Sequence, residues 1–250
     1  EVEEWYFVHG TFEGVPAIQR RIVSDYRADV RKYAEGLDPL RITSVFDSIP
    51  AQLAKENKKF QLAVVAKGAR HKDYWGCVEW LQDAGIVTVC RALDFPELPI
   101  AAHADASRYK LYFADSGLLL SQIDEEAQKD VRIRRNLGTW KGGFFENVIA
   151  EALVKSDVGP FYYKKENSTL EMDFFMRFRN DLVPIEVKGE NAKAKSLRTL
   201  IESEHYGDIT WGIKLVNGNV GFENRILTLP HWCAFYLKRV SGEENLSFGN

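Results

Sequence analysis

The chain is poor in cysteine, and its few cysteines are widely separated. There are three cysteines in 250 residues and no Cys-x-x-Cys pair. This pattern argues against both a disulfide framework and a zinc site, and it suits the reducing cytoplasm, where we expect the protein to reside. The five histidines are also dispersed. None of them is predicted to be a metal ligand.

A strong charge of one sign is also absent. Lysine and arginine together number 33 and aspartate and glutamate 36, which gives a formal net charge of −3. Any nucleic-acid surface must therefore be a local patch. No apolar run is long enough to cross a bilayer and no signal peptide is visible, so no membrane partner is expected. The P-loop pattern Gly-x4-Gly-Lys-Ser/Thr is missing as well.

The composition is that of a globular protein, with 45% hydrophobic and 12% aromatic residues. A chain of this length favours two domains, predicted at 1–115 and 116–250. The first contains helical periodicity that ends with a helix over 71–85, followed by strand-like runs at 86–93 and 108–115. This order is typical of a winged helix-turn-helix, in which 71–85 would be the DNA-reading helix.

The second domain is predicted to be mixed α/β, so the whole chain is expected to be α+β. An amphipathic helix is predicted over 139–156, followed by a strand at 160–165 and a hairpin at 170–190. Further on, a helix-like stretch at 194–205 precedes another strand at 208–216. Helices on both sides of strands are the basis of this expectation.

The hairpin "LEMDFFMRFRNDLVPIEVKGE" carries acidic residues in strongly β-forming strands. Side chains alternate along a strand, so the apolar side chains can share one face while Asp173, Glu186 and Lys188 share the other. A turn centred on Asn180-Asp181 would place Asp173 directly opposite Lys188, with Glu186 diagonal to it. A slip of one residue would drive the acids into the core.

Two carboxylates and a lysine around one point suit a phosphodiesterase that uses Mg²⁺ or Mn²⁺. The alternative is a salt bridge on a solvated sheet face. A third acid could come from the 139–156 helix, where geometry does not choose between Glu146 and Glu151. Glu171 and Glu190 share the face of the hairpin and are interpreted as local negative charge only.

The spacing Asp-x12-Glu-x-Lys after a helix with a glutamate resembles the PD-(D/E)xK superfamily of restriction-endonuclease-like nucleases. The resemblance implies that Asp173, Glu186 and Lys188 are catalytic and that Asp173, Glu186 and Glu146 hold Mg²⁺ or Mn²⁺. It is also the reason for preferring Glu146 as the third acid. The sequence departs from the pattern at Met172, where the family often has proline.

A second resemblance covers nearly the whole chain. It is carried by "GVPAIQRRIVSDYRADVRKY", "SIPAQLAKENKKF", "GARHKDYWGCVEWLQDAGIV", "YKLYFADSGLL" and "IEVKGE". These blocks resemble the C-terminal half of bacterial and archaeal AAA-type ATPases, in which a P-loop domain precedes a winged helix and a restriction-endonuclease-like domain of unknown function.

This second resemblance implies an ATPase region ahead of Glu1, and ATP would bind only there. The expected function is that of a DNA-binding ATPase region with a magnesium-dependent nuclease-like domain. The alternative is a catalytically inactive module that binds DNA or a partner protein and regulates the ATPase. The expected partners are DNA and the ATPase domain, and a homo-oligomer is a further option.

Overall fold

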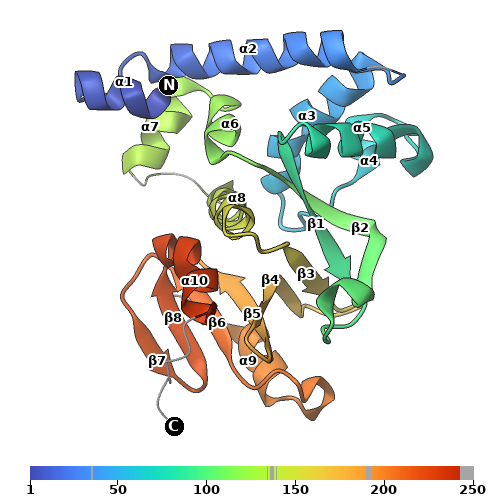
Figure 1. The fold of residues 1–250 in the computed structure, drawn as a ribbon, viewed down its shortest axis with the longest axis vertical. Coiled ribbons are helices and arrows are strands. Elements are labelled where there is room, and N and C mark those ends of the chain that lie inside the picture. Colours follow the sequence, from blue (N-terminus) through green and yellow to red (C-terminus); the bar gives the residue numbers. More distant parts are fainter. Residues whose placement is uncertain (35, 134, 136–137, 139, 190–192, 243–250) are drawn as a thin grey trace. The chain divides into compact units, whose positions relative to one another are not determined.

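The computed structural model describes all residues except 35, 134, 136–137, 139, 190–192 and 243–250. The protein is α+β, as predicted, with helices in its N-terminal part followed by a mixed sheet (Figure 1). The chain divides into two compact units. We call residues 1–87 with 113–140 the helical unit, and residues 88–112 with 141–250 the sheet unit. No helix in the described part of the chain combines the length and apolar character needed to span a membrane.

The helical unit is built around helices that pack through regularly spaced apolar side chains. Its helices are α1 (Val2–His9), α2 (Val15–Tyr33), α3 (Pro39–Leu53), α4 (Leu62–Val65), α5 (His71–Asp83), α6 (Ser116–Ser121) and α7 (Glu125–Ile133). The Asp38 carboxylate begins α3 by accepting a hydrogen bond from the Leu40 N–H at 2.9 Å, and Pro39 fits the first turn. The predicted apolar stripe of α5 is buried, and α5 packs against α3.

A mixed eight-stranded sheet forms the described core of the sheet unit. Its strands are β1 (Val87–Leu93), β2 (Ala104–Phe113), β3 (Phe161–Lys164), β4 (Glu171–Phe178), β5 (Asp181–Val187), β6 (Gly212–Val216), β7 (Gly221–Glu223) and β8 (Ile226–Pro230). They follow the order β2-β1-β3-β4-β5-β6-β8-β7. Strand β4 is antiparallel to both β3 and β5, whereas β6 is parallel to β5 and to β8.

The two strands expected to form the wing lie in this sheet. Strand β1 pairs in parallel with β3, with Arg91 opposite Phe161 and Leu93 opposite Tyr163. The predicted limits 1–115 and 116–250 would assign both strands to the first domain, whereas the compact units place residues 88–112 with the sheet. The order of elements along the chain suggested that β1 and β2 form a wing. Which strands they pair with is decided by long-range pairing, here of β1 with β3.

The remaining helices cover the sheet and complete its core. They are α8 (Trp140–Lys155), α9 (Lys195–Glu202) and α10 (Leu237–Gly242), with short 3₁₀ helices at Ile100–His103, Glu204–Tyr206 and His231–Tyr236. Helix α9 contacts β4 and β5 and buries Leu197 and Leu200 with Phe175 and Leu182. Helix α8 buries Ile149 and Leu153, as its periodicity predicts, and it brings Glu146 to the site described below.

Candidate metal and phosphodiester site

The β4–β5 hairpin has a tighter turn than the sequence predicts. Phe178 pairs with Asp181, and Phe174 pairs with Ile185. Only two residues therefore connect the strands, and the first of them, Arg179, has a positive φ of 56°. Such a conformation is uncommon for residues other than glycine, asparagine and aspartate. The local sequence consequently favoured a turn one residue further along.

The predicted pairing of Asp173 with Lys188 is therefore wrong by two residues. The observed register, continued along both strands, sets Asp173 opposite Glu186 instead. Because side chains alternate with a period of two, a shift of two residues changes the neighbours and keeps the faces. The acidic side chains and Lys188 thus remain on a common side of the hairpin.

Asp173 is held by the backbone of the neighbouring strand. Its Oδ2 accepts a hydrogen bond from the Val187 N–H at 2.8 Å. Burial, and after it the charge of Glu146, raises the pKa of the Asp173 carboxyl to about 7. Lys110, the Val187 N–H and Lys188 oppose this shift in part. Near neutral pH the carboxyl is therefore close to its midpoint of protonation.

Glu186 is a buried carboxylate with only one of its oxygens engaged. The residue is 4% exposed, and its Oε1 lies 2.7 Å from the Lys188 Nζ. Its Oε2 is buried and has no hydrogen-bond partner among the residues that the structure describes. Burial alone would lower the pKa of Lys188, but the charge and hydrogen bond of Glu186, together with the charges of Asp173 and Glu146, outweigh it and the pKa is raised. Lys188 is therefore a cation, and its side chain is 32% exposed.

Helix α8 supplies Glu146 rather than Glu151 to this cluster. The Glu146 Oε2 accepts a hydrogen bond from the Tyr112 hydroxyl at 2.9 Å and lies 3.4 Å from the Lys110 Nζ. Glu151, which is also buried, forms an ion pair with Lys155 at 2.5 Å. Glu146 is thus the helix glutamate whose charge acts on Asp173. Its role as a metal ligand stays a prediction.

Lys110 is a central residue that sequence reasoning missed. Its side chain is 1% exposed, and its Nζ lies 3.0 Å from the Glu171 Oε1 as well as 3.4 Å from the Glu146 Oε2. The same ammonium group lies 4.9 Å from the centre of the Tyr162 ring. Burial would lower the pKa of Lys110, but the nearby carboxylates raise it, so the group is charged.

Glu171 also has a larger part than the sequence suggested. It was interpreted as local negative charge, but its carboxylate joins the buried Lys110 and Lys164, which lies 3.1 Å from its Oε2. These ion pairs lower the pKa of Glu171 although burial alone would raise it. The sequence did contain a signal for the buried Lys110, because this lysine lies between Tyr109 and Leu111 in a run of strand-forming apolar residues. Glu190 lies outside the described residues.

The donor types fit a hard divalent cation. No group of three or more His, Cys, Asp or Glu side chains is arranged to hold a metal ion within the described ranges. Magnesium, however, is commonly held through one or two carboxylates, with water and phosphate as its other ligands. Asp173 and Glu186 can supply such a pair, and the unpartnered Glu186 Oε2 is the oxygen that a cation would engage.

Comparison with known proteins relates the second part of the chain to ATPase-associated proteins. Residues 9–129 match DUF8612 and residues 141–232 match DUF4143, both of which are domains of unknown function. DUF4143 is a domain found in AAA-ATPase-associated proteins, in agreement with the resemblance drawn from the sequence. No curated protein and no solved structure matches the chain. The acids of α8, β4 and β5 and Lys188 lie in the second match, and Lys110 lies in the first.

Proposed function

We propose that the sheet unit is a magnesium-dependent, nuclease-like domain of an AAA-type ATPase and that it hydrolyses phosphodiester bonds in DNA. One observation carries the proposal: Glu186 is buried with an oxygen that has no hydrogen-bond partner in the described part of the chain, beside Lys188. A buried carboxylate oxygen without a partner is costly. That cost is explained if the oxygen is reserved for a ligand.

Each residue of the cluster has a role that follows from its environment. Asp173 and Glu186 would hold the cation, with Glu146 as the third acid. Bound Mg²⁺ would stabilise the charge on the phosphate and make an attacking water more acidic. Lys188 offsets the charge of Glu186 and, because it is partly exposed, can also orient a water or contact an incoming phosphate. Asp173 must release its proton before it can act as a ligand.

A second candidate function is favoured by Lys110. Its ammonium group already balances Glu146 and Glu171 inside the fold. A cluster whose charge is balanced by a lysine needs no metal ion to be stable. In that case the chain would be a catalytically inactive module that binds DNA or a partner protein and regulates the ATPase.

A plasmid-nicking assay separates the two functions. The purified chain is incubated with supercoiled DNA and Mn²⁺ or Mg²⁺, next to the Asp173→Asn and Glu186→Gln variants. Loss of a metal ligand should lower the nicking rate by about 100-fold or more. Glu151→Gln is the matched control, because Glu151 lies on α8 but pairs with Lys155. A parent that nicks no DNA with either ion favours the inactive module. Nicking that survives both substitutions would show that it does not arise at Asp173 and Glu186.

A further inference from the structure

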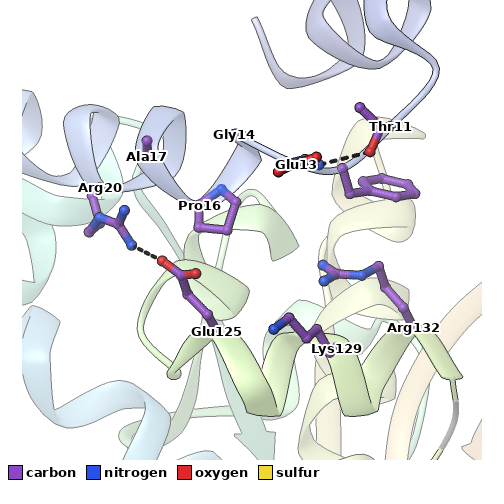
Figure 2. A pocket seen from close by; sticks show the side chains of 10 residues that line it. Thr11, Glu13, Gly14, Pro16, Ala17, Arg20, Glu125, Lys129 and Arg132 are labelled. Atoms are coloured by element: carbon purple, nitrogen blue, oxygen red, sulfur yellow. Dashed lines mark hydrogen bonds and ion pairs between the residues drawn. The ribbon is translucent and has the colours of Figure 1, made fainter.

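Among the pockets along helix α2, two include Arg20. The first has a volume of about 660 Å³ and includes Arg20, Lys129 and Arg132. Figure 2 shows Lys129 and Arg132 extending from α7 on the side that faces Pro16. The second has a volume of about 490 Å³ and includes Arg20, Arg27 and Arg31. Cationic side chains therefore follow one another from α7 along α2. We call Arg20, Arg27, Arg31, Lys129 and Arg132 the cationic track.

The track is only partly neutralised by acids. Arg20 pairs with Glu125 at 2.6 Å, Arg27 with Asp47 at 2.7 Å, and Lys129 with Glu126 at 2.8 Å. The second pocket, however, has no acidic residue in its lining. Arg31 and Arg132 form no ion pair with any residue that the structure describes. Two guanidinium groups, one in each pocket, are thus available for an anion from outside the chain.

The arginines of α2 lie on one side of the helix. Arg20, Arg27 and Arg31 are seven and four residues apart, which corresponds to nearly whole turns. With a rise of 1.5 Å per residue, Arg27 and Arg31 are about 6 Å apart along the helix axis, and Arg20 and Arg27 about 10 Å. The shorter step is close to the distance between neighbouring phosphates in an extended nucleic-acid strand.

Planar groups at one end of the track favour an unpaired strand. The guanidinium carbon of Arg132 lies 5.5 Å from the centre of the Phe12 ring, and the Phe12 ring stacks on Tyr6 with centroids 4.7 Å apart. This stack holds the Arg132 guanidinium at the wall of the first pocket. Unpaired bases stack on aromatic rings and on arginine planes, whereas paired bases in a duplex cannot.

We infer that the cationic track binds the phosphates of a single-stranded segment of nucleic acid, with a base stacked at Arg132. The inference rests on the proposed function and extends it, because it names the form of the substrate and the surface that holds it. Uncharged donors beside the arginines, such as Ser24 and Gln122, suit phosphate oxygens. This surface differs from the 71–85 helix that the sequence suggested as the DNA-reading element.

Binding of a fluorescent oligo-dT of about 15 nucleotides tests the inference. Anisotropy is measured in EDTA at several salt concentrations, so that no metal-dependent cleavage takes part. The variant Arg31→Gln/Arg132→Gln should bind at least tenfold more weakly than the parent. Each lost phosphate contact on a single strand lowers the magnitude of the log–log salt slope by about 0.7, so the double variant, which loses the phosphate contact of Arg31, should lose at least about 0.7.

The matched control is Arg21→Gln/Lys32→Gln, which removes the same amount of charge, here from two positions of α2 outside the track. Arg21 pairs with Glu1 and Lys32 lies over Tyr33, and neither lines a track pocket. The control should keep the affinity and salt slope of the parent. Equal losses in both double variants would overturn the track. Tighter binding of a blunt duplex or of an acidic peptide would overturn the assignment to a single strand.

The Asp173→Asn variant separates failure of this inference from failure of the proposed nuclease. It should bind oligo-dT as well as the parent does in EDTA and yet cleave no DNA in Mn²⁺. If the parent cleaves nothing but the track variants still lose binding, the nuclease proposal fails and the track stands. If the parent cleaves DNA and the track variants bind as tightly as the parent, the nuclease proposal stands and the track fails.

Discussion

The Lys110 Nζ lies 3.4 Å from the Glu146 Oε2, and these two side chains are only 1% and 6% exposed. Lys110→Met therefore leaves Glu146 and Glu171 in the interior without their shared cation. We expect the free energy of unfolding to fall by about 3–5 kcal/mol, as for other broken buried ion pairs. Urea denaturation measures this loss.

The control for this substitution is Lys155→Met, which breaks the ion pair of Glu151 with a lysine whose side chain is 57% exposed. It should cost no more than about 1 kcal/mol. Adding Glu146→Gln to Lys110→Met should restore part of the stability. Equal costs for the two lysines would show that Lys110 does not balance the cluster.

Asp173 should make the stability of the protein depend on pH. Its pKa is about 7 in the folded protein and near 3.8 when unfolded. Between these values the folded state holds a proton that the unfolded state has released. The contribution of this proton to the free energy of unfolding is therefore complete below about pH 4. It is lost as the pH rises toward 7, by up to about 1.4 kcal/mol per pH unit.

Denaturation of the parent and of Asp173→Asn across this range isolates that contribution. The difference in unfolding free energy between them should shrink as the pH rises, because the amide does not titrate. Stability that rises from pH 4 to 7 in the parent relative to the variant would contradict a raised pKa for Asp173.

Metal binding should be visible as stabilisation, independently of cleavage. If Mn²⁺ binds at Asp173 and Glu186, Mn²⁺ at 100 times its dissociation constant adds about 2.7 kcal/mol to the unfolding free energy. Glu186→Gln should melt near the parent temperature without metal, because Lys188 is partly exposed and keeps access to water. The variant should lose the response to Mn²⁺, which calorimetry measures.

The control Glu151→Gln should retain the Mn²⁺ response of the parent. A response that persists in Glu186→Gln would place the ion elsewhere. Loss of stability in Glu186→Gln, together with no response in the parent, would identify a structural salt bridge with Lys188.

Gly212 tests how closely α9 packs on the sheet. A Cβ added at this glycine would lie 2.4 Å from the Leu197 Cδ1 and 3.2 Å from the Pro184 Cγ. Leu197 is completely buried and has little room to move. Gly212→Ala should therefore lower the unfolding free energy by about 1–3 kcal/mol. Gly221→Ala, where a Cβ would meet nothing within 4 Å, is the control and should be nearly neutral in thermal melts.

The amino-acid sequence by itself determined which side chains of the β4–β5 hairpin share a face. Alternation along the strands placed Asp173, Glu186 and Lys188 together, and this result survived a register error of two residues because the period is also two. Helical periodicity likewise indicated α5 and α8. These features depend on neighbours within a few residues, which any local pattern records.

Only the tertiary structure decided the surroundings of those residues. The strands expected to form a wing join the sheet next to β3 through long-range pairing. The local sequence of 86–115 does not predict this pairing partner. The same pairing carries Lys110 into the interior, where it meets Glu146 from α8 and Glu171 from β4. From sequence alone, a lysine is normally predicted to be exposed to solvent. Its burial is set by segments that lie 36 and 61 positions away in the chain, and only their packing supplies the carboxylates that make burial tolerable.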